Sequence, residues 1–186
     1  IEHSQNFVDL NQYGIAPRGP HLPAASYALN AQAGNRGVYS FCMCPGGLIV
    51  PAATSPGEIV VNGMSLSRRD SPYANSGVVT AVELEDMKPY NAAGALMGVA
   101  LQREVEQKMF SVGNGSQAAP AQRLTDFLAK RVSLDIPESS YIPGLFSAPL
   151  HELLPAWIYD RLAYGIRGFD HKMKGYVDAE AVVVAT

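Results

Sequence analysis

The first half of the chain alternates short apolar runs with turns rich in glycine and proline, a pattern that favours antiparallel β-strands. Residues 38–44, VYSFCMC, are largely β-branched and aromatic and are followed by the turn Pro45-Gly46-Gly47. Residues 48–53 are apolar again, so we expect them to return as the hairpin partner of residues 38–44.

Two further apolar runs extend this pattern toward the middle of the chain. Residues 58–61 end at Asn62-Gly63, a dipeptide that marks tight hairpin turns, and residues 78–82 form another β-branched run. Together the runs predict about four to six antiparallel strands, as a sheet or a partial barrel, within residues 25–85.

The second half of the chain changes to a helical period. Apolar residues fall on one helical stripe over residues 95–112, and Gly113 marks the expected end of that helix. Pro120 is expected to open a second helix, and a third amphipathic stretch covers residues 150–166. The run at 180–185 is strand-like, so we expect it to rejoin the sheet.

These patterns predict an α+β fold made of one domain over residues 1–186. We expect a β-rich part over residues 1–90, a helical part over 91–178 and a closing strand over 179–186. The chain opens on isoleucine and ends on a strand-like run, so we expect the domain to be cut from a longer polypeptide.

Composition argues against several classes of function. The formal net charge of −3 disfavours a nucleic-acid-binding protein, and no apolar run approaches the roughly 20 residues that cross a bilayer. Charged residues are 17% of the chain, below the usual value of about 25%, so part of the surface is expected to contact other protein. Two cysteines without an export signal favour a cytoplasmic protein.

The two cysteines, Cys42 and Cys44, are the first candidates for chemistry. Residues two apart in a strand share a face, so both thiols are expected on one side of the sheet. A structural zinc site needs about four ligands, and neither cysteines nor suitably spaced histidines supply them, so no metal is expected. Three interpretations stay open: core packing, a redox dithiol, or a binding role in which the glycine turn brings bare backbone close to a ligand.

Other motifs indicate loops rather than active sites. Residues 113–118, GNGSQA, match the letters of a dinucleotide fingerprint but follow a helical stripe instead of a strand, so we expect a helix end and a loop. Arg68 and Arg69 follow a turn and are expected in a solvated charged loop. The residues alone therefore indicate an α+β domain without a self-sufficient active site.

Several phrases nevertheless resemble one family, in order and over nearly the whole chain. They are VYSFCMCPGG (38–47), NGMSLSRRDSPYANS (62–76), AGALMGVALQREVEQKMFSVG (93–113), PAQRLTDFL (120–128), and LPAWI with FDHKMKGY (154–158 and 169–176). They look like the C-terminal region of the uncharacterised FAD-dependent dehydrogenases, a bacterial flavoprotein family. The chain departs from the family's pattern at Ser26 and Ala28, where the family tends to carry an acidic residue and a lysine.

The resemblance implies that this region is inserted in a flavin-binding domain of the same polypeptide, with FAD bound outside these residues. The 186 residues alone are then expected to bind no FAD and to be inactive, with that flavin domain and a small-molecule substrate as partners. The residues that would face the flavin ring or the substrate are Pro45, Gly46 and Gly47 beside the catalytic candidates Cys42 and Cys44, with Asn62, Ser65 and Arg69 as secondary candidates.

The leading hypothesis is thus a substrate-binding or cap domain of an FAD-dependent oxidoreductase, and two other classes stay open. A non-catalytic module that binds a ligand or a protein would account for the low charge content. A small thiol-redox domain would use Cys42 and Cys44 through a strained Cys-x-Cys disulfide, which is easily reduced.

Overall fold

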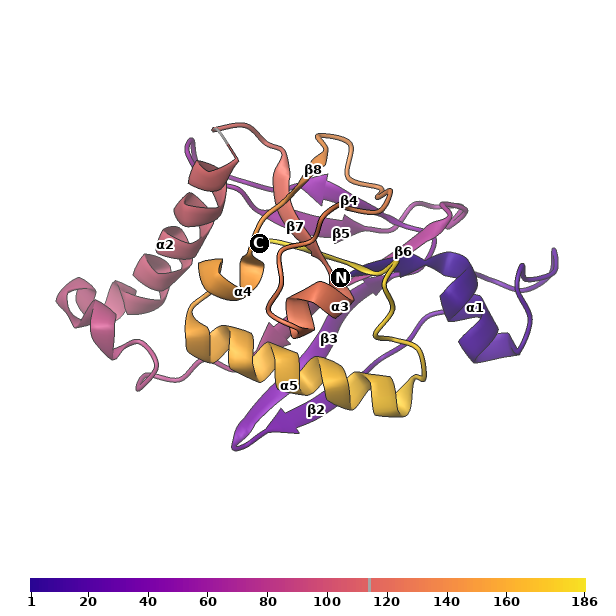
Figure 1. Cartoon of the computed structure of the whole chain (residues 1–186), viewed down its shortest axis with the longest axis horizontal. Helices are drawn as coiled ribbons and strands as arrows, with labels where there is room; N and C mark the ends of the chain where they lie inside the picture. Colours follow the sequence, from indigo (N-terminus) through magenta and orange to yellow (C-terminus); the bar gives the residue numbers. More distant parts are fainter. Residues whose placement is uncertain (114) are drawn as a thin grey trace.

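The computed structural model describes residues 1–113 and 115–186, and their strands form two sheets. Seven strands form one sheet in the order β2-β3-β6-β1-β9-β7-β8, and β4 and β5 form a separate two-stranded ribbon (Figure 1). The strands are β1 Glu2–Ser4, β2 Asn30–Ala33, β3 Arg36–Cys44, β4 Leu48–Pro51, β5 Val61–Met64, β6 Tyr73–Thr80, β7 Ala119–Arg123, β8 Leu145–Ser147 and β9 Val182–Val184.

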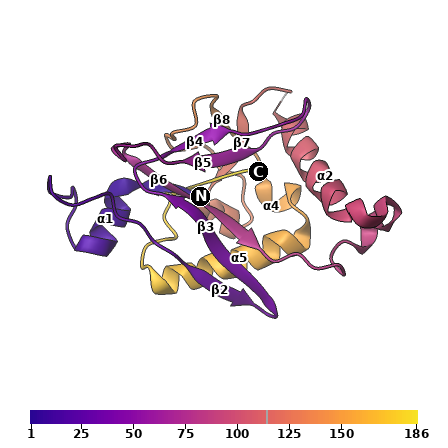
Figure 2. The same ribbon diagram turned by 180° about the vertical axis from the view of Figure 1, so that it is seen from behind.

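One long helix, α5, packs against β2, β3 and β6, and α1 and α2 lie at opposite ends of the molecule (Figures 1 and 2). The helices are α1 Gln5–Tyr13, the 3₁₀ helix η1 Lys88–Leu96, α2 Met97–Val112, α3 Leu124–Leu128, α4 Leu150–Leu153 and α5 Ala156–Lys172. Gly165 lets α5 approach β3 closely, because a Cβ at this position would overlap the side chain of Val38.

The fold is α+β, as the sequence predicts, and its large sheet is open rather than closed into a barrel. Among the described strands, β7 and β8 pair in parallel and the other pairs are antiparallel. Residues 25–85 hold β2 to β6, which is within the predicted number of strands. The predicted return of the C-terminal run is confirmed, since β9 lies between β1 and β7.

The predicted hairpin between residues 38–44 and 48–53 is wrong. β3 pairs with β2 and β6, so both of its edges are occupied, and β4 leaves the large sheet to pair with β5. The strand predicted at 58–61 begins only at Val61, and Asn62-Gly63 lies inside β5 instead of forming a turn. Turn chemistry at a dipeptide indicates a local preference, which pairing with β4 overrides here.

Helices form in the three predicted regions, but the bounds of two of them differ from the prediction. α2 ends as predicted, with Gly113 at its C-cap. Pro120 does not open a helix, because it lies in β7 beside β8, and α3 begins at Leu124. The stretch at 150–166 forms two helices, α4 and α5, because Pro155 interrupts it.

The sequence pattern does not predict β1 and α1, although β1 lies inside the sheet between β6 and β9. Glu2 and His3 of β1 are buried polar residues, so the apolar alternation that marks a strand is missing. Ser4 ends β1 and begins α1, since its hydroxyl accepts a hydrogen bond from the backbone N–H of Phe7 at 3.2 Å. The main core includes Phe127, Ile166, Phe169 and Tyr176, and α5 contributes two of these residues.

Candidate functional site

A cavity of about 310 Å³ lies where the two ends of the sequence meet in the sheet. Its walls come from β3, β6 and β9, from the β4–β5 ribbon, and from α3, α4 and α5 with their flanking loops. The lining residues are largely apolar, and none of those described is Lys, Arg, His, Asp or Glu. They include Phe41, Cys42, Ile49, Val61, Asn62, Gly63, Asn75, Ser76, Phe127, Leu150, Leu154 and Val184.

Ile1 and Thr186 both line this cavity, and Figure 1 shows the two chain ends near each other in the middle of the molecule. The backbone N of Ile1 donates to Ser76 O at 2.8 Å, and Ser76 N donates to Ile1 O at 3.0 Å. At the other end, Val61 N donates to Thr186 O at 2.9 Å. The pairing of β1 with β9 at Glu2 and Val182 brings the two ends together.

The turn at Pro45, Gly46 and Gly47 is buried and is packed against the chain's own backbone. Gly46 has φ +55°, a conformation that favours glycine, and a Cβ there would overlap the backbone of Arg69. A Cβ on Gly47 would lie 2.5 Å from the carbonyl oxygen of Met64. The glycines thus serve a close backbone approach within this chain, and contact of the turn with a flavin in a longer protein stays a prediction.

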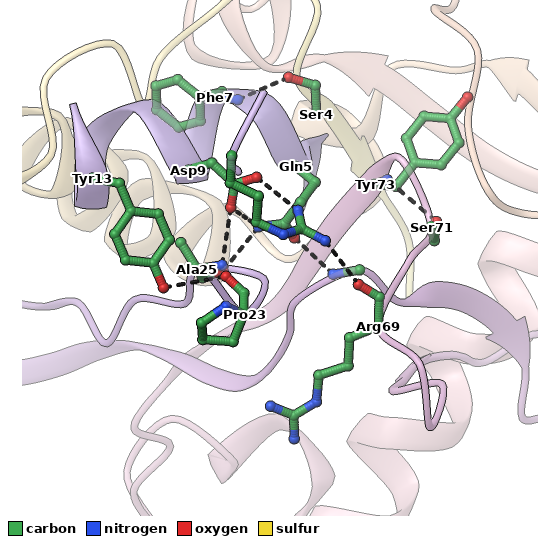
Figure 3. A network of polar contacts seen from close by, with 12 residues as sticks. Ser4, Gln5, Phe7, Asp9, Tyr13, Pro23, Ala25, Arg69, Ser71 and Tyr73 are labelled. Carbon is green, nitrogen blue, oxygen red and sulfur yellow. Dashed lines mark hydrogen bonds and ion pairs between the residues drawn. The ribbon is translucent and has the colours of Figure 1, made fainter. Parts of the chain in front are cut away.

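A network of polar contacts from α1 holds this turn (Figure 3). The Gln5 side chain accepts from Gly46 N at 2.7 Å and donates to Asp9 Oδ1 at 2.8 Å. Asp9 also accepts from Ala25 N at 2.9 Å and from Arg18 at 2.7 Å. Burial alone would raise the pKa of Asp9, but the hydrogen bonds from Ala25, Arg18 and Gln5 lower it below its usual value.

The two cysteines do not share an environment, because the register of β3 shifts between Phe41 and Cys44. Cys42 lies in this bulge with φ +45°, is exposed and lines the cavity. Cys44 is buried, and its Sγ donates to the Cys42 carbonyl at 3.3 Å. The expectation that both thiols lie on one face, which assumed regular strand alternation, is therefore wrong. Both thiols are free.

The secondary candidates separate into two groups. Asn62 lines the cavity from β5, next to Gly63. Ser65 and Arg69 are exposed in the segment after β5 and do not line the cavity, although Arg69 O accepts from Arg18 at 3.3 Å. Their place in substrate binding stays a prediction.

Sequence reasoning missed Asn75 and Ser76, which line the cavity from β6. Both are 2% exposed, in a strand where alternation would put only one of two neighbours in the interior. The signal in the sequence is the run Asn75-Ser76-Gly77, whose small residues directly precede the β-branched residues 78–80 of the same strand.

The other motifs lie away from the cavity. GNGSQA connects α2 to β7, so it does not follow a strand and open a helix, and its Asn114 lies outside the described residues. Within residues 1–113 and 115–186, no three His, Cys, Asp or Glu side chains group as metal ligands. No helix in those ranges has the length and apolar character that a membrane span requires.

Comparison with known proteins gives the family of this chain. A family model described as "FAD-dependent protein, C-terminal domain-like" matches residues 1–186. The chain belongs to this family. An uncharacterized protein of Clostridium beijerinckii is 43% identical over 187 residues, which is 98% of this chain and 34% of that relative. The chain thus spans about a third of the length of this relative.

Membership of the FAD-dependent family agrees with the resemblance in the sequence phrases. The matched family makes this chain a domain associated with FAD-dependent proteins. The similar protein from Clostridium beijerinckii is described only as uncharacterized, so this comparison adds no activity to the family match.

Proposed function

We propose that the chain is the substrate-binding or cap domain of a cytoplasmic FAD-dependent oxidoreductase of the dehydrogenase type. In this proposal it is one domain inserted in the flavin-binding part of the same polypeptide. The observation that carries the proposal is that Ile1 and Thr186 both line one apolar cavity. Polypeptide joined to either end would therefore start at that cavity, and in this proposal that polypeptide binds the FAD.

The register of β1 indicates where the incoming polypeptide would run. Glu2 pairs with Asn75 of β6 and with Val182 of β9, so a strand continued upstream of Ile1 would pair next with Gly77 and Val184. These two residues line the cavity. The incoming segment would therefore fill the slot between β6 and β9 and leave the part of the cavity under the β4–β5 ribbon for a ligand.

The flavin would supply the electron chemistry, and this chain would bind the substrate, orient it and exclude water. Cys42 of β3 and Asn62 of β5 line the cavity and are the proposed contacts with the substrate or the flavin ring. The turn at 45–47 would hold Cys42 in place through its packing against the backbone around Arg69.

The test is FAD binding by the intact protein and by the 186-residue chain, each purified in the presence of added FAD. We expect the intact protein to carry one FAD per polypeptide, released on denaturation, and the isolated chain to carry none. An intact protein that neither retains nor binds FAD would overturn the proposal. FAD retained by the isolated chain would contradict the placement of the flavin outside it.

A further inference from the structure

Asn75 carries a buried hydrogen-bond donor to which the described part of the chain offers no partner. Asn75 lies on β6, is 2% exposed and lines the cavity. Its Nδ2 has no hydrogen-bond partner among the described residues. A buried donor without a partner costs stability, so folded proteins rarely contain one unless a water molecule or a ligand completes it.

The position of the Asn75 amide is fixed from the other side. Its Oδ1 lies against Gly63 of β5, and a Cβ on Gly63 would overlap that oxygen and lie 3.1 Å from the Sγ of Cys44. Gly63 thus leaves room for the amide group under the ribbon. Any side chain at position 63 would displace the Asn75 amide from this place.

The residues that line the cavity with Asn75 select the kind of ligand. Ile49 and Val61 of the β4–β5 ribbon are apolar lining residues. The described lining residues include no Lys, Arg or His, so a carboxylate or phosphate group would enter without a counter-charge. A neutral oxygen acceptor on an apolar body fits this combination of an unpartnered amide donor and largely apolar walls.

We propose that Asn75 binds the carbonyl oxygen of a neutral, apolar carbonyl compound in this cavity, and that Asn75 orients the ligand. This proposal rests on the function proposed above in one respect: the ligand is a substrate only if the parent protein is a flavoenzyme. Binding by Asn75 itself does not depend on flavin chemistry.

The experiment compares two probes of nearly equal shape on the intact protein. 2-Acetylnaphthalene presents a carbonyl oxygen, and 2-isopropenylnaphthalene presents a methylene group in its place. We expect the ketone to bind about tenfold more tightly, which is the net effect of one hydrogen bond. Asn75→Leu should remove this preference while the hydrocarbon binds about as before. Asn6→Leu, the same replacement on the exposed face of α1, is the control and should keep it.

A second measurement keeps the proposal testable if the Asn75→Leu variant does not fold. In unmutated protein labelled with ¹⁵N-asparagine, the side-chain amide signal of Asn75 should shift with the ketone and not with the hydrocarbon. Equal binding of both probes, no binding of either, or a ketone preference that survives Asn75→Leu would each overturn the proposal. An intact protein without FAD that still shows the Asn75-dependent preference would reject the proposed function and leave this inference standing.

Discussion

Gly46 shows how one residue can fix the geometry beside the cavity. Its φ of +55° favours glycine, and the space that a side chain would need is occupied by the backbone around Arg69. Gln5 then binds the free N–H of this glycine at 2.7 Å. Glycine is therefore the residue that fits this position, because it adopts the positive φ, needs no room for a side chain and keeps the N–H that Gln5 binds.

Gly46→Ala should destabilise the protein by roughly 3 kcal/mol, because strain at positive φ adds to a backbone overlap. Gly57→Ala is the matched control, since Gly57 has φ +79° and a Cβ there would meet no atom within 4 Å. The control should cost about 1 kcal/mol. Urea unfolding measures both variants, and equal losses would show that the packing around Gly46 is loose.

His3 is a buried residue whose charge state links folding to pH. Its ring lies 4.6 Å from the ring of Tyr176, and its Nε2 donates to Tyr176 O at 2.8 Å. Burial lowers the pKa of His3 to about 4 from its usual value of 6.5. The unfolded chain therefore binds a proton more readily than the folded chain between these two values.

His3 should accordingly make stability fall as the pH drops from about 6.5 toward 4, by up to about 3 kcal/mol. His3→Gln keeps a side-chain N–H donor and removes the titration, so its unfolding free energy should depend less on pH in this window. His21→Gln, at an exposed histidine, should follow the unmutated protein. Parallel profiles for all three proteins would contradict the buried neutral His3.

At the level of elements, an ion-pair cluster joins α5 to the segment that follows β6. Arg161 of α5 donates to both carboxylate oxygens of Asp86, at 2.6 and 2.9 Å. Arg36 of β3 lies 3.7 Å from the same carboxylate. The hydrogen bonds from Arg161 are the main reason why the pKa of Asp86 falls to about 2.

Because this pKa lies below the ordinary value of 3.8, Asp86 stabilises the fold above about pH 4 and loses this effect as the pH falls toward 2. Asp86→Asn should lower the unfolding free energy by about 1–2 kcal/mol at pH 7, and the difference should shrink below pH 4. Asp70→Asn, at an exposed ion pair with Arg68, should change it little. A pH-independent loss in Asp86→Asn would point to packing instead of charge.

The sequence predicts correctly those elements whose signal lies in a few neighbouring residues. The predictions fail where contacts with residues distant in the sequence decide the structure. The apolar stripe of α2 and the β-branched run of β3 are visible in a few residues, and both elements form. Pro120 has the preferences of a helix start, yet β8 and β9 make it part of a strand. β1 is hidden because the buried Glu2 is satisfied by Ser140 N at 3.0 Å, a contact 138 residues away.

The candidate site was accessible from the sequence only in part, for the same reason. Cys42 and Asn62 are candidates from the sequence that line the cavity, and their contact with a flavin or a substrate stays a prediction. Asn75 becomes a candidate only in the folded structure, where its amide oxygen lies next to Gly63 of β5. Only there is it visible that its Nδ2 has no partner among the described residues. The bulge that separates Cys42 from Cys44 likewise depends on the register with β6.

At the scale of the whole molecule, the incoming polypeptide would lie between β6 and β9. Ile1 and Ser76 exchange both backbone hydrogen bonds, so the Val78 N–H is the next on that edge of β6. We expect the Val78 amide to exchange hydrogen slowly in the intact protein and fast in the 186-residue chain. Val79, whose amide faces β3, should be protected in both. Fast exchange of Val78 in the intact protein would contradict the continued strand.

The central claim, that this domain places its cavity at a flavin, is tested most directly by the distance between Cys42 and the flavin. A nitroxide attached to Cys42 in a Cys44→Ser background of the intact protein can be measured against the flavin semiquinone by pulsed dipolar EPR. The account predicts a distance of about 16 Å or less, the radius of gyration expected for a domain of this size. A distance beyond about twice that radius, or an intact protein without flavin, would contradict it.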